Sequence, residues 1–141
     1  MYDAILFPTD GSEGASDALS HALALAETFE ATLHVLYVAD SNRDSVTVVG
    51  NEVVDALEVE GESVVADVVE RARTAGVDTV DEVVQGAPHR TIVDYADERD
   101  VDVIVMATHG REGLDRYLLG SVTEKVVRTA PVPVLTVRME E

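Results

Sequence analysis

The chain has 141 residues, 46% hydrophobic and 27% charged, which fits one folded domain and excludes a disordered or low-complexity protein. It carries 28 acidic residues against 10 basic ones, a formal charge of -18, so we expect it to repel DNA and other nucleic acids. It has no cysteine, which excludes disulfides, thiolate catalysis and sulfur-ligated metals.

Its apolar stretches are short: the longest, such as Val103 to Ala107, run for about five residues, far below the ~20 that a membrane-spanning helix needs. The first residues show no basic leader and no small-residue cleavage site. We therefore expect a cytoplasmic protein without a membrane partner. The acidic excess is costly in dilute buffer and is screened at ~1 M salt, which favours a halophilic source; an ordinary acidic protein is the alternative.

Short runs of strand-forming residues alternate with segments whose apolar residues recur at helical spacing. In chain order we predict a strand at 2–7, a helix at 15–29, a strand at 31–38, a polar connection at 40–50, a helix from Val53 to Gly76, a strand at 80–84, a helix from Pro88 to about Asp100, a strand at 101–107, a helix at 121–129 and a strand at 133–138. Gly61 interrupts the second helix at a propensity cost of ~1 kcal/mol. The nearly continuous apolar strand at 101–107 should be central, and Pro133 places the last strand at an edge or start.

Five strands that alternate with four helices, with no break in composition, predict a single domain over residues 1–141. Right-handed crossovers then give an α/β fold, one three-layer α/β sandwich around a five-stranded parallel sheet of order 3-2-1-4-5. In such a sheet ligands bind beyond the carboxyl ends of the strands, near the point where strand order reverses. Three segments should meet there: Pro8–Ser12, Val38–Asp40 and Ala107–Gly110.

The run from Gly110 to Ser121 is bracketed by glycines and leads into the last predicted helix. Glycine lets a ligand approach the main chain, and the N–H groups of a helix's first turn carry about half a positive charge, which favours phosphate as the ligand. Ser121 and Glu124 also fit a capping box, in which the serine satisfies the helix's own amides. Spacing alone leaves both interpretations open.

Residues 107–138 form an electropositive segment in this acidic chain, because they hold five basic and three acidic residues. The five bases are Arg111, Arg116, Lys125, Arg128 and Arg138. Chance clustering is the simpler explanation, and Arg128 or Arg138 could simply face solvent. The segment coincides with the glycine-bracketed run, however, and this favours an anionic ligand.

The segment Val103–Arg138 resembles the signature of the universal stress protein family, in its ATP-binding branch. That branch has the pattern Gly-x-x-Gly-x9-Gly-(Ser/Thr). Gly110, Gly120 and Ser121 fit this pattern, whereas Ala107 stands where the first glycine belongs. An added methyl at that position is expected to crowd the ribose or the adenine.

Pro8-Thr9-Asp10 and the Val38 end of the second strand also look like family positions, so the resemblance covers the whole chain. It implies an adenine-nucleotide alpha-hydrolase-like fold that binds ATP with Mg2+ or Mn2+ bridging the phosphates. The residues that it implies are Pro8 and Asp10 beside the ribose with Thr9 between them, Val38 and Met106 at the adenine, Ala107, His109, Gly110 and Arg111 around the nucleotide, and Gly120, Ser121, Val122 and Thr123 at the phosphates. Simpler roles are core packing for Val38 and Met106, a strand end at Pro8 and a helix cap at Asp10.

The histidines do not predict a catalytic or metal site. His109 titrates near neutrality, but the sequence positions no second histidine or carboxylate pair to complete a hydrolytic set, so a loop hydrogen bond is its expected role. His21, His34 and His89 lie in different predicted elements without metal-ligand spacing. We therefore expect no dedicated catalytic residues.

These observations predict an ATP-binding stress-response regulator that acts as a nucleotide-dependent switch or sensor, with at most slow ATP hydrolysis. A nucleotide-free partner-binding module, which Ala107 keeps open, and a dedicated ATP hydrolase on the same fold are the alternatives. A phosphate-receiver domain is disfavoured because Gln85-Gly86-Ala87 supplies no acidic cluster. The resemblance implies a homodimer through the fifth strand, Val132 to Val137, and an exposed apolar edge suits such pairing.

Overall fold

The computed structural model describes residues 2–40, 46–49, 52–108 and 120–138. Their elements, in chain order, are β1 (Ala4–Pro8), α1 (Glu13–Phe29), β2 (Thr32–Asp40), β3 (Val46–Val49), β4 (Glu52–Asp55), α2 (Ala56–Thr74), β5 (Thr79–Gly86), α3 (Pro88–Glu98), β6 (Val103–Ala107), α4 (Ser121–Thr129) and β7 (Val134–Val137). Five parallel strands form one sheet in the order β5-β2-β1-β6-β7, while β3 and β4 form a separate antiparallel pair. The predicted three-layer α/β sandwich and its strand order are confirmed.

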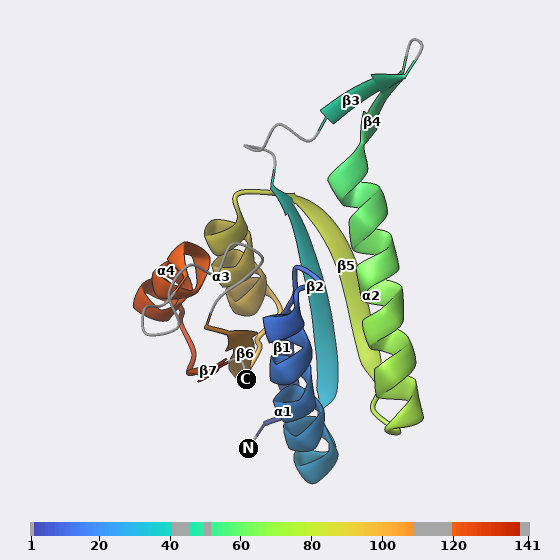
Figure 1. Cartoon of the computed structure of the whole chain (residues 1–141). Helices are drawn as coiled ribbons and strands as arrows, with labels where there is room; N and C mark the ends of the chain where they lie inside the picture. The colour runs from blue at the N-terminus through green and yellow to red at the C-terminus, as the bar shows by residue number, and fades with distance from the viewer. Residues whose placement is uncertain (1, 41–45, 50–51, 109–119, 139–141) are drawn as a thin grey trace.

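Helices α1 and α2 cover one face of the sheet, and α3 and α4 cover the other (Figure 1). The first face carries a core built on Ile5, Phe7 and the alanines of α1. The second face carries a core that includes Leu6. Successive residues of β1 thus point into opposite cores, which explains why an interior parallel strand has an almost continuous apolar sequence.

The strand predicted at 101–107 is interior, but β1 rather than β6 holds the middle of the sheet. β6 also begins later than predicted, at Val103. Asp102, the residue before β6, accepts hydrogen bonds through its Oδ2 from the backbone amides of Asp3 at 2.8 Å and Ala4 at 3.0 Å. This carboxylate fastens the amino end of β6 to that of β1. The last strand, β7, is an edge strand, as Pro133 predicted.

The predictions for residues 46–49 and 52–55 were wrong, while residues 41–45, 50 and 51 of the predicted connection lie outside the described residues. Instead of a polar connection followed by helix, the chain forms the hairpin of β3 and β4, and α2 begins only at Ala56. Figure 1 shows this hairpin beyond the start of α2, away from the five-stranded sheet. β-branched residues favour extended structure, and the valines at 53 and 54 pair with residues of β3 rather than continue the helical pattern.

Gly61 does not interrupt α2, which continues through it to Thr74. A β-carbon at this position would overlap the ring of Tyr37, a buried residue of β2. Glycine therefore allows close contact between α2 and the sheet, which offsets its low helix propensity. Gly76, with a φ of 76°, lies just beyond the end of α2, as predicted.

Candidate functional site

The strand order reverses between β1 and β6, because the chain proceeds from β1 outward through β2 to β5 and then returns to the opposite side of β1. Pairing between β1 and β6 comprises Ile5 with Val103 and Leu6 with Ile104, whereas β1 pairs with β2 as far as Pro8. The two strands at the reversal are therefore paired near their amino ends and not at their carboxyl ends. Ligands of open parallel sheets bind at such a point.

The segment after β1 is held in a fixed turn. The Thr9 amide donates to the Leu36 carbonyl at 2.9 Å, and Thr9 Oγ1 accepts from the Gly11 amide at 3.1 Å. Asp10 Oδ1 accepts from the Ser12 amide at 2.9 Å. The helix cap is Ser12, whose Oγ accepts from the Ala15 amide at 3.3 Å, so the alternative that Asp10 caps α1 is wrong. This turn orients the Asp10 carboxylate beside the carboxyl end of β1.

Val38 and Met106 both belong to the core on the α3 and α4 side, where Met106 is buried and Val38 is half-buried. The simpler role predicted for Val38 and Met106, core packing, is therefore confirmed for both residues. Ala107, the next residue, packs against the opposite core, on the α1 and α2 side. Its methyl group is therefore on the other face of the sheet from the two residues assigned to the adenine.

The start of α4 lacks the predicted capping box. Gly120 is the cap residue, with extended backbone angles and no side-chain hydrogen bond, and Ser121 is the first residue of the helix. Glu124 consequently lies one position too far along to complete the box, and its carboxylate pairs with Arg128 at 2.8 Å instead. The first-turn amides of α4 are therefore not satisfied by a cap side chain.

Two hydrogen bonds fasten the start of α4 to the end of β6, and a third joins that strand end to β7. The Gly120 amide donates to the Thr108 carbonyl at 2.7 Å, and the Thr108 amide donates to the Val137 carbonyl at 3.0 Å. The Thr123 hydroxyl donates to the Ala107 carbonyl at 2.8 Å. Residues 106–108 and 120–123, predicted to share a site, are thus brought together. Because the Gly120 amide is used in this contact, the amides of residues 121–123 are the candidates for binding a ligand.

His109, Gly110 and Arg111 lie outside the described residues, as do Arg116 and the rest of the glycine-bracketed run. Of the electropositive segment, the described bases Lys125, Arg128 and Arg138 are exposed. Arg128 is paired with Glu124 and contributes little unbalanced charge.

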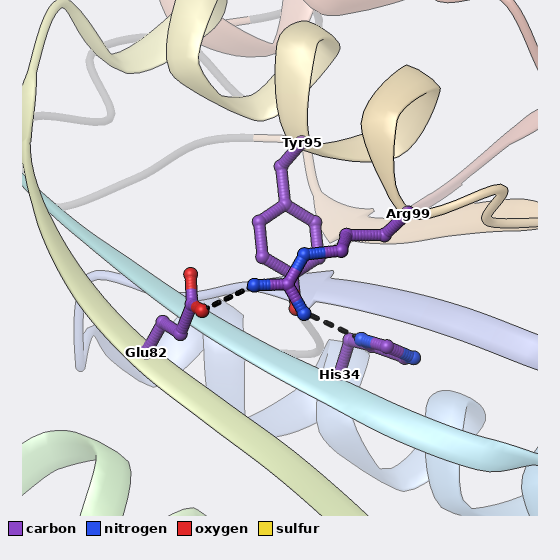
Figure 2. Close-up of polar contacts among 4 residues, drawn as sticks. All are labelled: His34, Glu82, Tyr95 and Arg99. Carbon is purple, nitrogen blue, oxygen red and sulfur yellow. Dashed lines mark hydrogen bonds and ion pairs between the residues drawn. The ribbon is translucent and has the colours of Figure 1, made fainter.

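A second polar cluster, which the sequence did not predict, lies between α3 and the sheet. It joins His34 of β2, Glu82 of β5, Tyr95 of α3 and Arg99 at the end of α3 (Figure 2). His34 Nδ1 and the Tyr95 hydroxyl are 2.8 Å apart, and Arg99 donates to Glu82 at 2.5 Å. The Arg99 guanidinium also lies 5.0 Å from the centre of the Tyr95 ring. These contacts connect the end of α3 to two strands.

Burial governs the titration of this cluster. It lowers the pKa of His34, which the nearby Arg99 lowers further and Glu82 raises. Burial also raises the pKa of Tyr95. His34 is therefore neutral near pH 7, when the Tyr95 hydroxyl can donate to Nδ1.

The described residues contain neither a metal-ligand cluster nor a membrane-spanning helix. No three His, Asp or Glu side chains there converge on a point that could hold a metal ion. None of the described helices is both long and apolar enough to cross a bilayer.

A five-stranded parallel sheet with helices on both faces and a reversal of strand order beside β1 defines a doubly wound α/β protein. The chain belongs to the universal stress protein family, whose sequence profile matches residues 1–138. Universal stress protein MJ0531 of Methanocaldococcus jannaschii is 38% identical over 141 residues, which cover 98% of this chain and 83% of that protein. Universal stress protein MJ0577 of the same organism is 34% identical over 155 residues, which cover 98% and 96%.

Solved structures agree with this assignment. The structure of MJ0577 matches with a TM-score of 0.85 and 32% identity, covering 100% of this chain and 99% of that one. A universal stress protein in complex with cAMP matches with a TM-score of 0.77 and 27% identity, covering 99% of each chain. The adenine-nucleotide alpha-hydrolase-like fold that the resemblance implied is confirmed.

Proposed function

We propose that this chain is an ATP-binding universal stress protein, a single domain over residues 1–141 that works as a nucleotide-dependent switch or sensor in the stress response. The observation that carries the proposal is the start of α4, which has a glycine cap without a side-chain bond and is fastened beside the reversal of strand order. Such a helix start offers amide donors and a partial positive charge to phosphate. The cAMP complex of a relative supports an adenine nucleotide as the ligand class.

In this proposal the nucleotide lies across the carboxyl ends of β1 and β6. Asp10, with Pro8 and Thr9, faces the ribose hydroxyls, and Val38 with Met106 contacts the base. The residues from Ala107 to Arg111 surround the nucleotide, and the amides of residues 121–123 bind the phosphates. A carboxylate suits ribose hydroxyls and apolar side chains suit a base. A bound Mg2+ or Mn2+ would neutralise part of the phosphate charge.

The protein is proposed as a binding protein with at most slow ATP hydrolysis. The described polar residues at the reversal point are engaged in turns and caps: Thr9 Oγ1 and Asp10 Oδ1 accept backbone amides, and the Thr123 hydroxyl donates to a carbonyl. None of these contacts arranges a general base against a second titratable side chain.

We further propose a homodimer through β7 and an origin in a salt-rich cytoplasm. β7 is an edge of the sheet, and Leu135 on it is 40% exposed. An exposed apolar edge favours pairing with a second copy. The formal charge of -18 is more easily accommodated in concentrated salt, where the Debye length is about 3 Å.

Titration calorimetry with Mg-ATP, in a KCl series from dilute buffer to ~1 M, tests the proposed function. ATP and the protein are both anionic, so we expect affinity to improve as salt screens their repulsion. A parallel titration with guanosine triphosphate tests whether the protein distinguishes adenine from guanine. Absence of heat at every salt concentration would contradict ATP binding and favour a nucleotide-free module. Rapid turnover of bound ATP would favour a dedicated hydrolase.

A further inference from the structure

Thr123 is a buried polar residue in the first turn of α4, with 3% of its surface exposed. Its hydroxyl donates at 2.8 Å to the carbonyl of Ala107, the last residue of β6. The bond spans sixteen positions of sequence, from the helix back to the strand. The donor proton of this hydroxyl is therefore already used within the protein.

Of the two described hydrogen bonds that fasten the start of α4 to the end of β6, this one alone involves a side chain. The other, from the Gly120 amide to the Thr108 carbonyl, is between backbone groups, which any residue supplies. The orientation of the helix start is thus sensitive to the residue type at position 123. The same first turn holds the amides assigned to phosphate.

We propose that Thr123 is a positioning residue for the phosphate site: its hydroxyl orients the first-turn amides of α4, and this hydroxyl does not itself contact the nucleotide. This inference rests on the proposed function. Amide donors and the helix dipole act on an anion only at short range and in a narrow set of directions, so a small rotation of the turn weakens them. The base and ribose contact other elements and do not depend on this turn.

The inference predicts an effect that depends on the phosphates. Thr123→Val keeps the shape of the side chain and removes the hydroxyl, which leaves the Ala107 carbonyl without this donor. We expect the affinity for ATP to fall about tenfold, while that for adenosine stays within about twofold. Thr123→Ser restores the hydroxyl and should bring ATP affinity back to within about threefold of the native chain.

Thr129 provides a matched control in the same helix. Its hydroxyl donates to the Lys125 carbonyl at 2.7 Å, but it is exposed and its acceptor belongs to its own helix. Thr129→Val should leave affinity for both ligands unchanged. ATP can be titrated by calorimetry and adenosine, a weaker ligand, by NMR, with circular dichroism on every variant to verify the fold.

Each possible outcome supports or overturns the inference. A selective loss of ATP affinity in Thr123→Val, with rescue by serine, supports it. Equal affinity in Thr123→Val and the native chain overturns it, and so does an equal loss for ATP and adenosine, which indicates a general structural role. If Thr123→Val does not fold, Thr123→Ser decides: native-like affinity supports the inference and strong loss overturns it. A native chain that binds neither ligand overturns the proposed function first and the inference with it.

Discussion

Helices α1 and α4 both begin at the carboxyl edge of the sheet, after β1 and β6, but their first turns differ. In α1 the Ser12 hydroxyl accepts from the Ala15 amide, so the chain satisfies its own donor. In α4 the cap is Gly120, without a side-chain bond. A helix leaves its first four amides unpaired unless a cap, water or ligand accepts them. Position at the reversal point is thus insufficient to make an anion site; the residue at the cap decides it.

The glycines before the two helices differ as well. Gly11 has a φ of 79°, and a β-carbon there would lie 2.7 Å from Val64 Cγ2, so both conformation and space require glycine. Gly120 has a φ of -63°, which any residue adopts. The backbone conformation and packing therefore require glycine at position 11. At position 120 the φ angle does not require glycine, and the effect of the residue is that α4 has no capping side chain.

The largest expected effect comes from making α4 resemble α1. Gly120→Asp supplies a cap side chain and places a negative charge where phosphate is proposed to bind. We expect ATP affinity to fall about 100-fold, with stability unchanged or raised by a few tenths of a kcal/mol. Gly120→Ser adds a cap without charge and should lose about tenfold. Calorimetry and urea unfolding measure the two quantities; native affinity in Gly120→Asp would refute the comparison.

The second prediction compares the two glycines by stability. Gly11→Ser should lower the free energy of unfolding by about 2 kcal/mol, because of the left-handed φ and the overlap with Val64. Gly120→Ser, the matched change, should raise it slightly or leave it unchanged. Urea unfolding of both variants is the measurement. Similar losses in the two would show that Gly120 is also required by the backbone.

The third prediction compares the loss of the serine hydroxyl at the start of each helix. Ser12→Ala removes the cap of α1 and should cost about 1 kcal/mol of unfolding free energy. Ser121→Ala removes a hydroxyl that caps nothing and should cost less than about 0.5 kcal/mol. If urea unfolding showed a larger loss of unfolding free energy in Ser121→Ala than in Ser12→Ala, Ser121 would be shown to cap α4, as the capping-box interpretation requires.

The smallest effect lies far from both helix starts. The pKa of His34 is lowered in the folded protein, so the unfolded chain binds its proton first as pH falls below about 6.5. Stability contributed by neutral His34 is present above that pH and declines below it. The loss should stay under about 1 kcal/mol because the side chain is half-exposed. We expect His34→Gln to show a shallower decline in unfolding free energy between pH 7.5 and 5.5, with ATP affinity unaffected; an identical decline would exclude His34 as its source.

The sequence predicted the main sheet well because its strands are largely apolar and because clear breakers separate the elements, such as Pro8 at the end of β1 and Gly76 after α2. It failed at the β3–β4 hairpin because Val53 and Val54 fit a helical pattern that continues into α2. Gly50-Asn51 between two valine-rich runs is a hairpin signal that the pattern of apolar residues obscured.

The candidate site was predictable in outline and not in detail. Glycine spacing and strand ends located the segments near Pro8, Ala107 and Gly120. Cap geometry could not be read from Ser121 and Glu124, because a shift of one residue in the helix start changes which group caps it. The bond from Thr123 to Ala107 is a long-range contact, and nothing local to either residue signals it.

The Asp102 carboxylate holds the amino ends of β1 and β6 together, and pairing between these strands stops at Leu6 and Ile104. The junction between β1 and β6 is therefore held at the amino ends of the two strands and is not paired at their carboxyl ends. β7 pairs along β6, and the Thr123 hydroxyl joins α4 to the same strand, so β6, β7 and the start of α4 are connected to one another on the far side of this junction from β2 and β5.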